Sequence, residues 1–105
     1  MSHQPKDAAL VAKMEQMFTK LGIEAIENHP KSELYADANP CDKFILVMRG
    51  EVENVIMDVV SRFSSRWQWD WWNAMNDKPW NQAHNSKFAA FVNHIAEQAY
   101  GKIKG

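Results

Sequence analysis

The chain of 105 residues has little of what marks secreted or membrane proteins. It has one cysteine, Cys41, and therefore no internal disulfide, which is typical of a protein from a reducing cytosol. No apolar run is longer than five residues, as in residues 44–48, whereas a membrane-spanning helix needs about 20 apolar residues. Residues 1–7 contain no apolar stretch of the kind found in signal peptides. We therefore expect a cytoplasmic protein with no membrane partner.

Glycine, proline and net charge are also low. Only four glycines and four prolines are present, and 46% of the residues are hydrophobic, which argues against a disordered or fibrous chain. The formal net charge is −1, so no overall positive field attracts nucleic acid or an anionic membrane. A chain of this size can bury a core without disulfides. We predict a disordered polar lead-in over residues 1–7 and a single helical domain over residues 8–105.

Recognisable catalytic and metal-binding signatures are missing as well. There is no glycine-rich phosphate-binding loop, and no serine or histidine stands in a known catalytic motif. Cys41 follows Pro40 at a position suited to a helix start, but Asp42 disfavours its thiolate and no pattern supplies a base. His94 and Glu97 have a spacing that metal-binding helix pairs use, but no second pair exists. The sequence predicts a non-catalytic protein with no metal and no cofactor.

What the chain has in excess is tryptophan. All five tryptophans lie between Trp67 and Trp80. Tryptophan is the largest side chain, and its N–H needs a partner when it is buried. So dense a cluster indicates either a heavy core or a surface that another molecule covers.

Apolar residues at helical spacing predict three helices. We expect Asp7 to cap the first, Gly22 to end it as a C′ glycine before one further turn, and Ser86 to cap the last. The three stripes are Leu10, Met14, Met17, Phe18 and Leu21; Val52, Val55, Ile56, Val59, Val60 and Phe63; and Phe88, Phe91, Val92, Ile95, Ala99 and Ile103.

Other segments are harder to assign. Residues 31–40 have a loop-like composition, and we expect Leu34 or Tyr35 to attach them to the core. Residues 44–48 form a short apolar run, which suits a buried strand as well as a buried helix. Residues 66–72 alternate between indoles and polar groups as a strand would, although a helix also accommodates them. We favour an all-α, compact bundle of about four helices; the alternative is an α+β domain with two short strands near 43–48 and 66–72.

If the second helix continues into the tryptophans, helical phase divides them. Trp67 and Trp71 then continue the core stripe, while Trp69 and Trp72 point away from it. We assign Trp67 and Trp71 to the core and leave Trp69 and Trp72 open between core and surface. Trp80 follows a turn, and we expect it to fold back onto an earlier helix.

An indole surface with a polar rim has the composition of a protein interface. We therefore predict a small non-catalytic cytosolic interaction module, such as an inhibitor, an immunity factor or an adaptor. Its partner is another protein or a second copy of the chain. The candidate partner-binding residues are Arg66, Trp69, Asp70, Trp72 and Asn73.

Two other ligand classes remain as alternatives. Arg62 and Arg66 beside stacked indoles could bind single-stranded nucleic acid. On a helix, however, Asp58 and Asp70 lie four residues from these arginines and neutralise them, so nucleic acid is less favoured. The six methionines and the aromatic residues could instead line a pocket for a small apolar ligand, although no convergent polar group marks one.

Overall fold

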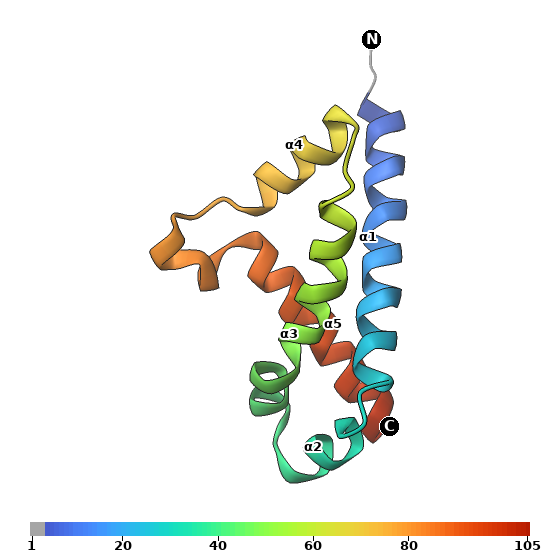
Figure 1. The fold of residues 1–105 in the computed structure, drawn as a ribbon, viewed down its shortest axis with the longest axis vertical. Helices are drawn as coiled ribbons and strands as arrows, with labels where there is room; N and C mark the ends of the chain where they lie inside the picture. The colour runs from blue at the N-terminus through green and yellow to red at the C-terminus, as the bar shows by residue number, and fades with distance from the viewer. Residues whose placement is uncertain (1–3) are drawn as a thin grey trace.

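Three long helices lie side by side along the long axis of the molecule (Figure 1). In this computed structural model, which describes residues 4–105 and their side chains from residue 7, they are α1 (Gln4–Glu27), α3 (Cys41–Val60) and α5 (Lys87–Lys104). The shorter helices α2 (Ser32–Ala38) and α4 (Arg66–Met75) pack at opposite ends of this bundle (Figure 1). Residues 4–105 contain no strand, so the all-α prediction is confirmed.

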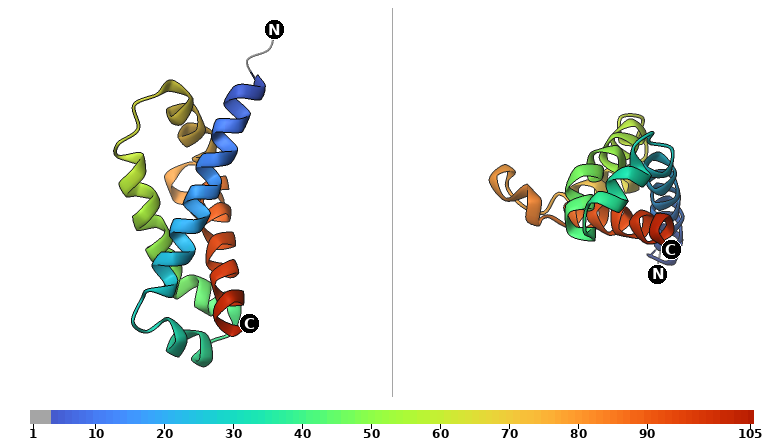
Figure 2. Two further views of the ribbon diagram at one scale, coloured as in Figure 1. Left: turned by 90° about the vertical axis from the view of Figure 1, so that its right-hand side faces the viewer. Right: turned by 90° about the horizontal axis from the view of Figure 1, so that it is seen from below.

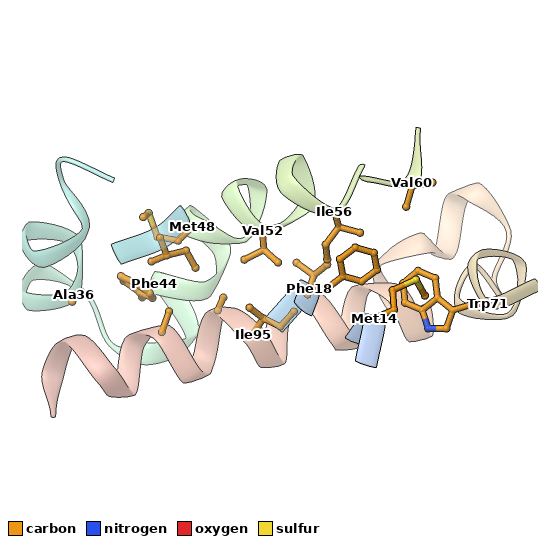
Figure 3. Packing of buried hydrophobic residues seen from close by; sticks show 14 of the residues in the cluster. Met14, Phe18, Ala36, Phe44, Met48, Val52, Ile56, Val60, Trp71 and Ile95 are labelled. Atoms are coloured by element: carbon orange, nitrogen blue, oxygen red, sulfur yellow. The ribbon is translucent and has the colours of Figure 1, made fainter. Parts of the chain in front are cut away.

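The core is a row of side chains between the three long helices, and it runs from Ala36 in α2 to Trp71 in α4 (Figure 3). The buried residues of α3 recur every fourth position, which places them on one face of the helix. They are Phe44, Met48, Val52, Ile56 and Val60. Residues 44–48 are therefore the first core turns of a long helix, and the strand alternative for them and for residues 66–72 is wrong.

Gly22 does not end α1, which continues to Glu27. A C′ glycine needs a positive φ, and no glycine in the described chain has one. Gly22 is buried, and a Cβ added there would lie 2.7 Å from Cγ2 of Ile95 and 3.0 Å from Cγ1 of Val52. The missing side chain therefore allows α1, α3 and α5 to approach closely at one point.

Helix α1 also begins earlier than the sequence pattern predicts. Residues 4–7 of the expected lead-in form its first turn, and Asp7 lies within that turn, where a negative charge is favourable. Residues 1–3 of the expected lead-in lie outside the described residues.

The segment expected as a loop over residues 31–40 contains α2. Tyr35 packs against the core, as predicted, whereas Leu34 is exposed. Ser32 is the first residue of α2, and Ala36 is the buried contact one turn later. The Tyr100 hydroxyl of α5 donates a hydrogen bond to the backbone oxygen of Asn39 at 3.3 Å, which fixes the end of α2.

The chain breaks between α3 and the tryptophans. Helix α3 ends at Val60, and α4 begins after Ser64 and Ser65. Oε1 of Gln68 accepts hydrogen bonds from the backbone N–H groups of both serines, at 3.0 and 2.9 Å. This cap satisfies donors at the start of α4. Four of the five tryptophans therefore lie on a helix of their own, whose phase is independent of α3.

Residues 76–85, which we call the projection, extend away from the bundle between α4 and α5 (Figures 1 and 2). The 3₁₀ helix η1 (Trp80–Asn85) forms its outer part, and every residue of the projection is exposed. The chain then enters α5 through Ser86, whose Oγ accepts a hydrogen bond from the backbone N–H of Ala89 at 3.1 Å. Ser86 is thus the cap that the sequence predicts.

Candidate functional site

Trp71 is the fixed centre of the aromatic cluster. It is 6% exposed, and its Nε1 donates a hydrogen bond to Oε2 of Glu15 in α1 at 2.8 Å. Its ring centroid lies 5.4 Å from that of Phe18 and 6.1 Å from that of Phe91. These distances are typical of favourable aromatic pairs. Trp71 therefore joins α4 to α1 and α5, and its assignment to the core is confirmed.

Trp67 and Trp72 lie at the margin of the core. Both are half-buried and pack against the buried cluster. The Trp72 ring meets the edge of Phe88 at 5.0 Å with an interplanar angle of 72°. Much of the Trp72 surface is therefore covered by α5, which reduces what it can offer to a partner.

Trp69 is the most exposed indole of α4. It is 41% exposed, and its ring packs edge-on against Phe63 at 5.5 Å. Phe63 itself is buried in the turn that precedes α4. Trp69 is thus held in place by one neighbour while part of its ring meets solvent.

The remaining residues of the predicted interface surround Trp69 on the outer face of α4. Arg66, Asp70 and Asn73 are exposed, and Nε of Arg66 lies 3.9 Å from Oδ2 of Asp70. We call the set Arg66, Trp69, Asp70 and Asn73 the α4 surface. Trp72, the fifth predicted residue, lies inward of this surface.

Trp80 is where the structure departs furthest from the sequence analysis. It is 90% exposed at the start of η1, so the expectation that it folds back onto an earlier helix is wrong. The sequence carries a signal for this exposure. Trp80 follows Pro79 and precedes Asn81 and Gln82, and no large apolar residue lies within four positions of it. An isolated indole among polar residues has no core stripe to join.

The projection is held in shape by hydrogen bonds. At its base, Oδ1 of Asp77 accepts a bond from the backbone N–H of Lys87 at 3.0 Å, and this bond lowers the pKa of the Asp77 carboxyl. Within it, the N–H of Gln82 donates to the backbone oxygen of Pro79 at 2.8 Å. The projection therefore presents Trp80 from a closed loop.

A cavity of about 420 Å³ lies where the projection meets the bundle. Its walls come from four elements, and we name one residue of each: Met57 of α3, Trp72 of α4, Ala83 of η1 and Phe88 of α5. A second, larger groove of about 670 Å³ runs between α1 and α5, and Glu15, Glu24 and Glu27 line one side of it. The wall of the 420 Å³ cavity includes residues of η1, the helix that begins with Trp80.

The residues considered for chemistry do not converge. Cys41 is half-buried, and burial together with the carboxylates of Glu97 and Asp42 raises the pKa of its thiol. That disfavours the thiolate that a nucleophile needs. His94 Nδ1 lies 3.5 Å from Oε1 of Glu97, with both side chains exposed. Within residues 7–105, no group of three or more His, Cys, Asp or Glu side chains is arranged to hold a metal ion.

The two arginines proposed as nucleic-acid contacts pair with carboxylates. NH2 of Arg62 lies 2.9 Å from Oδ2 of Asp58, and Arg66 pairs with Asp70 as described above. Both pairs have the spacing that the sequence predicts. Because their charges are offset locally, they add little positive field for a phosphate backbone.

No protein-family model, curated protein or solved structure matches the chain. No helix in residues 4–105 is long and apolar enough to cross a membrane.

Proposed function

We propose that the protein is a small non-catalytic protein-interaction module whose main contact is Trp80. The observation that carries this proposal is a 90% exposed indole at the end of a hydrogen-bonded projection. Burying one tryptophan removes about 150–250 Å² from water, worth about 4–6 kcal/mol before the costs of association. The free energy of an exposed indole is therefore lower when it is buried in a complex than when it is in water.

The shape and composition of the projection support the same role. A loop that is already closed by Asp77 needs little further ordering when it binds, which lowers the cost of association. Asn81, Gln82 and Asn85 are exposed on the same 3₁₀ helix as Trp80 and add neutral polar amides, as in the rim of a protein interface. Tryptophan is also enriched among the residues that dominate binding energy.

The α4 surface is a further candidate contact. Trp69 is partly exposed there beside a mutually paired Arg66 and Asp70. An inhibitor, an immunity factor or an adaptor in the cytosol would act through surfaces of this type without catalysis. We place the centre of binding on Trp80, because its indole is the more exposed of the two.

In-cell photo-crosslinking tests the proposal. A photoreactive amino acid at Asn81, next to Trp80, should form adducts with a partner in the native host, and Trp80→Ala should remove most of them. The same amino acid at the exposed Asn28, at the end of α1, is the matched control. Adducts that form equally at both positions, or that survive Trp80→Ala, would show that Trp80 does not dock a partner.

A further inference from the structure

We infer that the partner of Trp80 is a second copy of this chain. In this arrangement, Trp80 of each copy enters the cavity beside the projection of the other. The inference rests on the proposed function, because it names the molecule that covers Trp80.

The cavity suits an aromatic side chain. Its volume of about 420 Å³ lies in the range of ligand sites, roughly 300–1,000 Å³. Trp72 and Phe88 give it aromatic walls, and Met57 adds a thioether that packs well against rings. Met57 is 45% exposed, so part of this apolar lining faces solvent in the single chain.

The cavity also offers a partner for the indole N–H, which can only donate a hydrogen bond. Asn93 lines the cavity, and its Oδ1 is the one buried side-chain oxygen or nitrogen without a hydrogen-bond partner in the described structure. This oxygen is buried in the single chain, so the amide of the half-buried Asn93 has to rotate about χ2 to turn it toward the cavity when the indole binds. An unused acceptor in the wall thus complements the unused donor of Trp80.

Two opposite charges on the cavity wall are placed so that they can pair across a two-fold axis between two copies. Arg49 and Glu53 lie four residues apart on α3, both half-buried and both lining the cavity. Neither forms an ion pair with any described side chain. In a two-fold dimer, Arg49 of one copy can pair with Glu53 of the other, and the symmetry repeats this pair. Opposite charges that are unpaired within one copy are therefore satisfied between two.

The neighbouring positions of Trp80 and the cavity favour a closed dimer. Trp80 begins η1, and Ala83 and His84 of the same helix line the cavity. A two-fold axis between two projections therefore fills both cavities at once and leaves no free indole to recruit a third copy. The two indoles alone bury roughly 300–500 Å², below the roughly 1,200 Å² of a standard interface. We accordingly expect a dimer with a micromolar Kd.

Size-exclusion chromatography with light scattering on the untagged chain tests the inference. Between low micromolar and near-millimolar concentration, the mass should rise from 12.1 kDa to twice that value. Trp80→Ala should raise the Kd by about 30-fold or more, as expected for a dominant interface tryptophan. Leu34→Ala removes an exposed apolar side chain of α2 that does not line the cavity, so this control should leave the Kd unchanged.

A complementation experiment separates the indole from its receptor. Ala89 lines the cavity, so Ala89→Trp should fill it and weaken the dimer while leaving Trp80 free. Trp80→Ala keeps an empty cavity but has no indole to insert. Each variant alone should be monomeric. In a mixture, Trp80 of the Ala89→Trp variant can enter the empty cavity of the Trp80→Ala variant. This single contact should give a mixed dimer that native mass spectrometry detects. Circular dichroism checks that both variants fold.

A charge exchange on α3 gives a test that leaves both Trp80 and the apolar walls intact. Arg49→Glu and Glu53→Arg should each weaken the dimer, because like charges then meet across the axis. The double variant Arg49→Glu with Glu53→Arg should restore it.

Three results would overturn the inference: a monomer at every concentration, a dimer that Trp80→Ala does not weaken, or a charge exchange that does not restore association. If the isolated chain stays monomeric but Asn81 still forms Trp80-dependent adducts with another protein, the proposed function stands and only the second-copy inference fails. If both Asn81 adducts and dimer are absent, the proposed function fails with it.

Discussion

At the scale of single residues, the roles of Gly22, Trp71 and Trp80 depend on what surrounds each of them in the folded chain. Trp71 is buried because α4 holds it against α1 and α5. Helical spacing places it in the core only by extending the stripe of α3 across the break before α4. Helical spacing gives Gly22 and Trp80 the wrong roles, because it does not show which side chains from distant parts of the chain lie next to them. Gly22 packs against residues 30 and more positions away in sequence, Val52 and Ile95, whereas Trp80 is 90% exposed.

Because Gly22 lies where three helices approach closely, we expect Gly22→Ala to destabilise the fold. Alanine gains helix propensity of about 1 kcal/mol, but its Cβ would lie 2.7 Å from a methyl group of the β-branched Ile95. We expect a net loss of about 1–2 kcal/mol of unfolding free energy, measured by urea denaturation. Gly50→Ala is the matched control, since a Cβ there meets nothing within 4 Å; it should stabilise α3 by about 0.5–1 kcal/mol. Stabilisation by both substitutions would contradict the close-packing role.

Glu15 should matter because it satisfies the buried Trp71 N–H. Glu15→Ala removes that acceptor and should lower the unfolding free energy by about 1–3 kcal/mol. Glu15→Gln keeps an oxygen acceptor and should cost less. Glu24→Ala, on an exposed position of the same helix, is the control and should change stability little. An equal effect of Glu15→Ala and Glu24→Ala would mean that the indole bond contributes nothing.

At the scale of elements, the three apolar stripes locate the long helices, and Ser86 is correctly identified as a cap. The sequence does not determine where α3 ends, because apolar and aromatic residues continue through the break. The break depends on Gln68 turning back to Ser64 and Ser65. Nor does it identify α2 or the projection, whose positions depend on contacts with α5.

The projection should open in acid. The pKa of Asp77 is lowered chiefly by its bond to the Lys87 N–H, so its ionised form favours the folded loop. This contribution is present above the unfolded value of about 3.9 and is lost as the pH falls through the lower folded value. We expect NMR to show an Asp77 titration midpoint below the usual one, with the Lys87 amide shift following it. Asp77→Ala should speed hydrogen exchange at the Lys87 amide. A normal or raised midpoint would contradict the closed base.

At the scale of the whole molecule, charge argues against nucleic acid. The net charge is −1, and Arg62 and Arg66 each have a carboxylate neighbour. Titration with single-stranded oligonucleotides at low salt should leave tryptophan fluorescence unchanged. Quenching that weakens steeply with added salt would show phosphate contacts and favour the nucleic-acid alternative.

The bundle and the projection have different roles in the molecule. Helices α1, α3 and α5 supply the core, and α4 closes one end through Trp71. The projection adds nothing to that core, since every residue from 76 to 85 is exposed. Its closed base and its isolated indole are explained if it serves binding rather than folding.

The most direct test is therefore whether the Trp80 ring is exposed in the free chain and covered in a complex. Labelling with 5-fluorotryptophan gives one fluorine signal for each of the five indoles, and Trp80→Ala identifies the Trp80 signal. We expect this signal to have the largest solvent isotope shift in dilute protein and to lose it as the complex forms. A Trp80 signal without an isotope shift in the dilute monomer, or one that keeps its shift in every complex, would show that Trp80 is not the docking residue.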